Sequence, residues 1–238
     1  MDNDIFKKAY PVIALLVLCG ALVVAVAMWV SPEKDIQLEL GDSQESTEML
    51  PAPLTAEELQ AYEEDTTNKM NPIAVLTTNK GVIEIELFND YMPITAGNFA
   101  KLAREGFYNG TKFHRVIDGF MVQGGDPNTK TDDALKYGTG GPGYSIPDEF
   151  VEGENLTNVR GTIAMANSGP NSGGSQFFIN LVDNVNLDYN VPDPYNSAHP
   201  VFGRVVKGMD IVDAIAKVET NQNNLPLEAI VIESVEVK

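Results

Sequence analysis

The residues with the most chemical content lie in two short runs of this chain. The first reads Phe-His-Arg-Val-Ile-Asp-Gly-Phe-Met-Val-Gln-Gly-Gly-Asp-Pro over residues 113–127, and its alternating pattern predicts strands with a kink at Asp118. On one exposed or cavity-lining face this pattern places Arg115, Ile117, Phe120 or Met121, and Gln123. The second run, 161–180, sets a polar, glycine-rich loop between two apolar strands. Such a face offers hydrogen-bond donors and acceptors but no nucleophile.

Several other kinds of chemistry are excluded by the sequence. Ser175 lies outside any Gly-x-Ser-x-Gly elbow, which argues against a serine hydrolase. The glycine-rich stretch 138–143 lacks the Gly-Lys-Ser/Thr ending of a phosphate-binding loop. One cysteine, Cys19, and two histidines, His114 and His199, cannot make a His/Cys zinc cage. We therefore expect neither a metal nor a cofactor.

Charge narrows the range of partners. The 238 residues include 34 acidic and 16 basic ones, which gives a formal net charge of −18. Because few cations are available to neutralise phosphates, we expect no nucleic-acid partner. The same balance argues against docking on anionic lipid through a polybasic surface.

An uncharged, apolar run covers residues 9–30. As a helix it would span about 33 Å, enough to cross a hydrocarbon core of about 30 Å. Tyr10 and Trp29 lie at its ends, where amphipathic rings favour the membrane interface. Lys7 and Lys8 precede it, so the positive-inside rule predicts a cytoplasmic segment 1–8 and an extracytoplasmic remainder.

A cleaved signal peptide is the alternative for this run. Ala25-Val26-Ala27 has the small-x-small form of a signal-peptidase site. The apolar sequence continues through Met28-Trp29-Val30, which suits a retained anchor better than a cleavage region. With either outcome the globular part is exported, and a retained anchor makes the protein a single-pass protein of the cell membrane.

Residues 31–70 form an acidic stretch with eleven acidic and two basic residues. Few large apolar groups interrupt it, so we predict a flexible, self-repelling linker. Thr55-Ala-Glu-Glu58 resembles a capping box, which predicts one or two helical turns near 56–65.

The segment 71–238 has the pattern of a folded, mainly β domain. Residues 73–88 predict two strands joined by a turn at 79–81, since apolar and polar side chains alternate along them. Helices are predicted over 93–106 and 209–218, and a closing strand over 229–237. Many short strands and only two helices indicate a closed antiparallel barrel with helical caps.

The two chemical runs resemble the cyclophilin-type peptidyl-prolyl cis–trans isomerases. The run 113–127 is similar to the family signature, and Met-Ala-Asn…Gly-Ser-Gln-Phe-Phe-Ile within 161–180 is similar to its second conserved segment. The resemblance covers nearly all of 71–238 and ends with the segment 201–209. It implies an eight-stranded closed barrel capped by two helices, which isomerises X–Pro bonds without a cofactor and acts as a monomer.

The resemblance also implies roles for individual residues. The residues implied to act in catalysis are Arg115, Phe120 and Gln123. Those implied to bind the proline or the peptide backbone are Met121, Gly138, Ala166, Asn167, Ser168, Gln176, Phe178, Leu187 and His199. This chain departs from the family at Asn186, where many members carry tryptophan, and in the longer loop 188–198.

Three functional hypotheses follow. The first is a membrane-anchored prolyl isomerase that assists the folding of exported polypeptides, since uncatalysed isomerisation takes tens of seconds. The second is a non-catalytic module that holds proline-containing peptides in the same groove. The third makes the acidic segment 31–70 the functional part, which would recruit a basic partner or cations.

Overall fold

A computed structural model describes residues 52–64, 71–151, 156–189, 191 and 198–238. All of these belong to one compact unit that runs from Glu48 to Lys238. The predicted anchor 9–30, its alternative cleavage site and the acidic residues 31–51 lie outside the described residues. Within the part that is described, no helix is long and apolar enough to cross a membrane.

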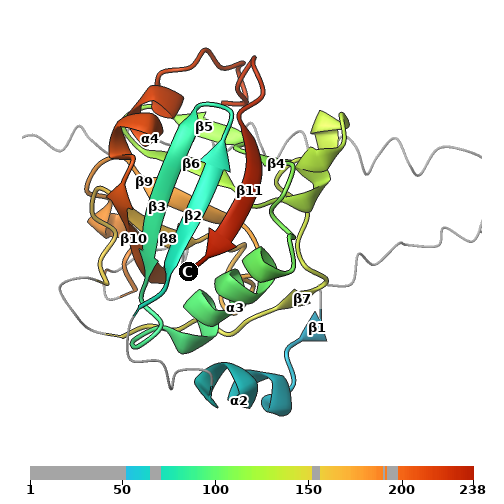
Figure 1. Cartoon of the computed structure of the whole chain (residues 1–238), viewed down its shortest axis with the longest axis vertical. Helices are drawn as coiled ribbons and strands as arrows, with labels where there is room; N and C mark the ends of the chain where they lie inside the picture. The colour runs from blue at the N-terminus through green and yellow to red at the C-terminus, as the bar shows by residue number, and fades with distance from the viewer. Residues whose placement is uncertain (1–51, 65–70, 152–155, 190, 192–197) are drawn as a thin grey trace, which may run out of the picture. The chain divides into compact units, whose positions relative to one another are not determined.

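The centre of the unit is a nine-stranded antiparallel sheet, which Figure 1 shows curling around the core. The order across it is β4-β11-β2-β3-β10-β8-β9-β6-β5. The strands are β2 (Ile73–Thr78), β3 (Gly81–Leu87), β4 (Thr111–Lys112), β5 (Arg115–Ile117), β6 (Met121–Gly124), β8 (Thr162–Met165), β9 (Phe177–Asn180), β10 (Val201–Lys207) and β11 (Val231–Val237). The prediction of a mainly β, antiparallel fold is confirmed.

The number of strands differs from the eight expected, because the chain changes partner within one extended segment. Phe113 still donates its N–H to Ile230, next to β11, whereas the His114 N–H is donated to Gln123 of β6. These two residues separate β4 from β5, so one stretch of chain supplies both edge strands of the curled sheet.

Successive side chains along each strand alternate between the two faces of this sheet. Val116, Val122, Ile179 and Ile163 lie opposite one another across four neighbouring strands, and each is at most 2% exposed. Since successive residues of a strand point to opposite faces, the residues on either side of this row lie on the other face of the sheet, where Met121, Phe178 and Ala164 are also buried.

Two of the helices pack beside the sheet as predicted. Helix α3 (Pro93–Arg104) begins with a proline and lies beside β10 and β11, whereas α4 (Met209–Ala216) packs near β3, β5 and β6 (Figure 1). Glu149 caps α3 from a distant loop, because its carboxylate accepts the N–H groups of Ile94 and Thr95. Three short 3₁₀ helices lie in the connections: η2 (Pro127–Lys130), η3 (Ala134–Lys136) and η4 (Val185–Leu187).

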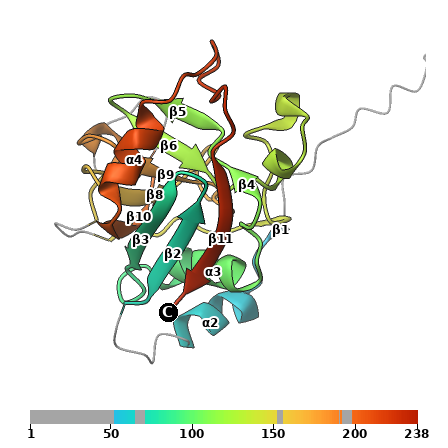
Figure 2. The ribbon, with the colours of Figure 1, turned by 45° about the horizontal axis from the view of Figure 1, so that its top comes forward.

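Residues 52–64, here called the arm, are ordered on the domain although they fall within the predicted linker. Strand β1 (Ala52–Pro53) pairs in parallel with β7 (Tyr144–Ser145), and helix α2 (Ala56–Glu64) lies beside α3 (Figure 2). Leu54 explains the docking, since its side chain is only 9% exposed and belongs to the core cluster.

The helical turns predicted near 56–65 are confirmed, together with their capping box. The Thr55 N–H donates to the Glu58 carboxylate at 2.9 Å, and the Glu58 N–H donates to the Thr55 hydroxyl at 3.3 Å. The backbone and hydroxyl hydrogen bonds from Thr55 lower the pKa of Glu58. A capping box satisfies two N–H groups that the first turn of a helix cannot pair internally.

We expect Leu54→Ala to release the arm from the domain. Removing a core side chain of this size costs about 2–5 kcal/mol where the site is fully packed. We expect a smaller cost for Leu54, which lies at the edge of the core. Hydrogen exchange of the Leu54 N–H, which is bonded to Ser145 at 3.1 Å, should accelerate, and so should that of Leu59 in α2. Leu227→Ala is the control, because that side chain is 64% exposed. Unchanged exchange in Leu54→Ala would show that the arm is held by other contacts.

Candidate functional site

A row of side chains crosses the outer face of the sheet next to the buried valine and isoleucine row. Arg115 of β5 lies opposite Gln123 of β6, Gln123 opposite Phe178 of β9, and Phe178 opposite Ala164 of β8. Directly opposite residues of antiparallel strands point to the same face. The pairing therefore brings a guanidinium, an amide and an aromatic ring together from three separate strands.

Hydrogen bonds join the polar members of this row into a chain. Arg115 Nη1 donates to Gln123 Oε1 at 3.3 Å, and Gln123 Nε2 donates to Gln176 Oε1 at 3.1 Å. Gln176 Nε2 then donates to the carbonyls of Gly138 and Gly140 at 3.0 and 2.9 Å. The two glutamines thus connect the sheet to the loop around Gly138.

The guanidinium of Arg115 stays available to a ligand. It lies over the ring of Phe120, with 5.9 Å from its central carbon to the ring centroid. No ion pair of Arg115 with a carboxylate occurs among the described residues. Partial burial lowers the pKa of Arg115, and the group still carries its charge near neutral pH.

A cluster of apolar side chains adjoins this cation. Met121 and Phe178 are 1% and 4% exposed, and Phe120 is half-buried beside them. The carbonyl of Phe120 accepts hydrogen bonds from the Leu181 N–H and the Asn184 amide, which fixes the turn that carries the ring. These apolar side chains suit contact with an apolar ring.

His199 and Leu187 lie at the rim of this cluster. The ring of His199 makes an edge contact with Phe178, with centroids 5.2 Å apart and planes at 86°. Its Nδ1 lies 3.0 Å from the Met165 carbonyl, and its backbone N–H donates to Leu187 at 2.9 Å. The structure therefore brings His199 to the site despite the long loop before it, while Asn186 is exposed beside the buried Leu187.

The segment 166–168 forms one wall of the groove. Ala166 donates its N–H to Gln176, and the Asn167 side chain donates to the Ala198 carbonyl at 2.8 Å, next to His199. Within the described part of the chain, the backbone N–H and C=O of Asn167 make no hydrogen bond, so a peptide could pair with them. Ser168 is exposed, and its N–H is bonded to Ser172.

Two positioning groups were missed by the sequence analysis, and the first is Asp126. It is fully buried and accepts the N–H of Asn128 at 2.7 Å and that of Gly138. Gly138 has φ of +86°, a conformation that favours glycine. Asp126 precedes Pro127 at the start of η2, and an Asp before Pro is the pattern of a helix N-cap that could have indicated this role.

The second missed group is Asp188, which holds the rim in place. Its carboxylate accepts hydrogen bonds from the Thr157 hydroxyl and from the backbone and side chain of Asn158. Asn158 in turn donates to the His199 carbonyl at 3.1 Å. No local pattern reveals these bonds, because the partners are about 30 to 40 residues apart.

This arrangement can bind and polarise a peptide but offers no covalent chemistry. The described residues contain no cluster of histidine, cysteine, aspartate or glutamate that could hold a metal ion. Amide groups and a free backbone edge suit a polypeptide of varied sequence, while the guanidinium lies over the ring of Phe120. Fold and site together define a protein whose exposed polar and apolar side chains suit the binding of a polypeptide.

Comparisons with known proteins agree with that class. The sequence model of the family described as cyclophilin type peptidyl-prolyl cis-trans isomerase/CLD matches residues 73–237. The chain belongs to this family, and its activity is the cis–trans isomerisation of peptidyl-prolyl bonds.

Relatives from distant organisms show the same similarity. A peptidyl-prolyl cis-trans isomerase of Acinetobacter baylyi is 44% identical over 173 residues, which cover 71% of this chain and 86% of the relative. Peptidyl-prolyl cis-trans isomerase A of Dickeya dadantii is 40% identical over 197 residues, or 81% of this chain and 98% of the relative. The crystal structure of a cyclophilin type isomerase from Cryptosporidium parvum aligns with a TM-score of 0.59 at 28% identity, over 71% of this chain and 97% of that one.

His114 makes stability depend on pH. The ring is 6% exposed, and neither nitrogen has a hydrogen-bond partner among the described residues. Burial lowers the pKa of His114, although the nearby Asp126 carboxylate opposes the shift. Below the unfolded pKa of about 6.5 the unfolded chain binds a proton that the folded chain does not. The free energy of unfolding therefore decreases as the pH is lowered, until the pKa of the folded state is reached.

We expect His114→Leu to remove this loss of stability at acidic pH. Between pH 7.5 and 5.5 the free energy of unfolding should fall more steeply in the parent than in the variant, by at most about 1.4 kcal/mol per pH unit for one proton. Urea unfolding at several pH values measures it. His199→Gln is the matched control, and its free energy of unfolding should still decrease at low pH because His114 is present. Parallel curves for the parent and His114→Leu would show that His114 does not cause the dependence.

Proposed function

We propose that this isomerase rotates X–Pro bonds in the groove around Arg115, with the proline ring in the pocket of Phe120, Met121 and Phe178. One observation carries this assignment: a guanidinium without a carboxylate partner lies over the ring of Phe120, next to the apolar side chains of Met121 and Phe178. All of its parts come from one chain, so the domain can act as a monomer.

The barrier to rotation explains why these groups suffice. Twisting a peptide bond destroys its amide resonance and costs about 18–20 kcal/mol. A catalyst has to bind the twisted amide better than either planar form. An apolar pocket excludes the water that stabilises the planar, polar amide. The Arg115 guanidinium can then donate a hydrogen bond to the pyramidal imide nitrogen or to the adjacent carbonyl, with no reorganisation of solvent.

The polar groups of the groove hold the peptide backbone. Asn167 offers a backbone N–H and C=O, and Gln123 and Gln176 offer side-chain donors and acceptors that their mutual bonds have already oriented. A solved structure of the Cryptosporidium parvum relative was determined in the presence of the dipeptide Ala-Pro. That structure supports an X–Pro dipeptide as the minimal ligand of this groove.

Arg115→Ala should abolish most of the catalysis. Removing a donor that acts on the transition state typically costs 10²- to 10³-fold, so we expect kcat/KM on an Ala-Pro peptide to fall by about 100-fold or more. Exchange spectroscopy by NMR with the full chain measures the rate directly. Arg204→Ala is the matched control, because Arg204 pairs with Glu86 on strands outside the site.

Two outcomes would contradict the proposal. Full activity of Arg115→Ala would show that the guanidinium plays no part in the mechanism, although the protein would still be an isomerase. Binding of the peptide by the parent without faster exchange would favour a non-catalytic module that holds proline peptides.

The proposal includes a location for the enzyme. The apolar run 9–30 supplies a single-pass anchor, with residues 1–8 in the cytoplasm and the isomerase domain outside, where newly exported polypeptides fold. The acidic residues between the anchor and the arm repel one another and so hold the domain away from the bilayer.

Membrane fractionation tests the anchor. We expect the full-length chain to stay in the membrane fraction after a carbonate wash, and protease added outside intact cells to digest the domain. Leu22→Arg should weaken retention, because a charge at the centre of a spanning helix costs about 2.5–3.5 kcal/mol or more. Release of a shortened chain cut after Ala27 would instead establish a cleaved signal peptide.

A further inference from the structure

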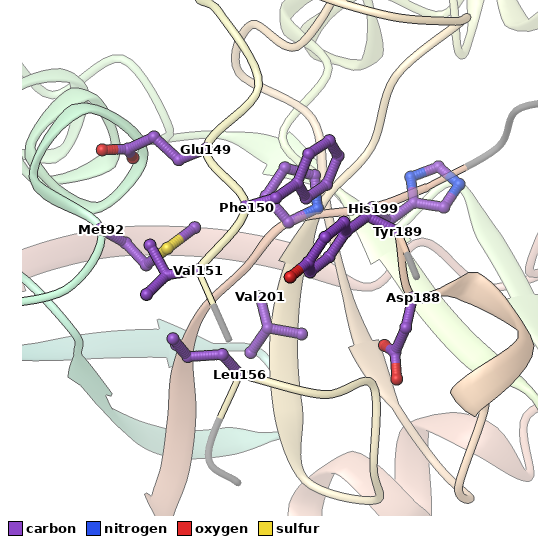
Figure 3. A pocket seen from close by; sticks show the side chains of 10 residues that line it. Met92, Glu149, Phe150, Val151, Leu156, Asp188, Tyr189, His199 and Val201 are labelled. Atoms are coloured by element: carbon purple, nitrogen blue, oxygen red, sulfur yellow. The ribbon is translucent and has the colours of Figure 1, made fainter. Parts of the chain in front are cut away.

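A pocket lies beside His199. Its walls include Met92, Phe150, Val151, Leu156, Tyr189 and His199 (Figure 3). His199 lines this pocket and also makes the edge contact with Phe178. The pocket and Phe178 therefore share His199 as a neighbour.

An exposed aromatic pair forms the open side of this pocket. Phe150 and Tyr189 stack with ring centroids 5.0 Å apart and planes at 18°, and Figure 3 shows them face to face. They are 36% and 39% exposed, and Val151 and Val191 beside them in the chain are 41% and 37% exposed. Large apolar side chains gathered on a rim in this way mark surfaces that bind partners.

The carboxylates at this pocket are already engaged by donors of the chain itself. Glu149 accepts the N–H groups of Ile94 and Thr95, at 3.0 and 2.6 Å. Asp188 accepts hydrogen bonds from the neighbouring Thr157 and Asn158. Because these oxygens serve the fold, the surface left for a ligand is apolar.

Tyr189 lies at the start of the loop 188–198. Asp188 and Tyr189 begin the long loop 188–198, and Asp188 holds that beginning rigidly. At the other end of the loop, Ala198 accepts a hydrogen bond from Asn167 of the groove wall.

We propose that Phe150 and Tyr189 form an apolar subsite of the groove, which takes a large apolar side chain of the client within a few residues of the proline. This inference rests on the proposed function, because it assumes that the proline lies against Phe178. A peptide that leaves the proline pocket over His199 reaches the aromatic pair next, since each extended residue adds about 3.3–3.6 Å. The subsite would select clients whose prolines adjoin hydrophobic segments.

A guest scan with the full chain tests this subsite. The host peptide is a central proline flanked by four alanines on each side, and leucine replaces one alanine at a time. The measured quantity is the ratio of kcat/KM on each leucine peptide to that on the host, by NMR exchange. At one or two adjacent positions we expect a ratio of about ten, which is typical for a side chain bound in an apolar pocket.

The aromatic pair should account for that ratio. In the double variant Phe150→Ala/Tyr189→Ala it should fall to about one, and Tyr189→Ala alone provides the same comparison if the double variant does not fold. Leu227→Ala removes an exposed apolar side chain elsewhere and should keep the ratio.

Three results would overturn the subsite. A ratio near one at every position shows that no such preference exists, and a ratio that survives both variants places it elsewhere in the groove. Both of these leave the isomerase itself intact. Absence of exchange on the host peptide by the parent would overturn the proposed function, and the subsite with it.

Discussion

The register of four neighbouring strands is the constraint on which the site depends. Val116, Val122, Ile179 and Ile163 must lie together in the core, because exposing them would cost about 1.5–3 kcal/mol for each side chain. A register slip of one residue would move the side chains of a strand to the opposite face of the sheet. The core therefore fixes the alignment of the adjacent row, in which Arg115, Gln123 and the buried Phe178 share the other face of the sheet.

Hydrogen-bonded polar groups hold the loops around the groove. Asp126 fixes the loop of Gly138, Asp188 fixes the start of the long loop, and Gln176 connects the first of these loops to the sheet. Asp126 is fully buried, and its hydrogen bonds offset the cost of that burial. A rigid groove suits a catalyst that works by preorganised electrostatics, since the protein does not have to rearrange as the bond twists.

Local patterns predicted the elements and part of the site, and the remainder depends on distant partners. Alternation along 113–127 was enough to place Arg115 and Gln123 on one face, and the capping box at Thr55 predicted α2. The pairing of Gln123 with Phe178 joins residues 55 apart, so no period within either strand reveals it. Docking of the arm depends on a single apolar residue, Leu54, within an acidic segment whose composition predicted a linker. The roles carried over from the family remain predictions for each residue.

The most direct test of this account is a crystal structure of the protein with an Ala-Pro peptide bound. We expect the proline ring to pack against Phe178 and Met121, with a guanidinium nitrogen of Arg115 about 2.7–3.2 Å from the proline nitrogen or the adjacent carbonyl oxygen. The backbone of Asn167 should pair with the peptide. A peptide bound elsewhere, or an Arg115 side chain turned away from the prolyl bond, would contradict the central claim that the strand register places this cation for catalysis.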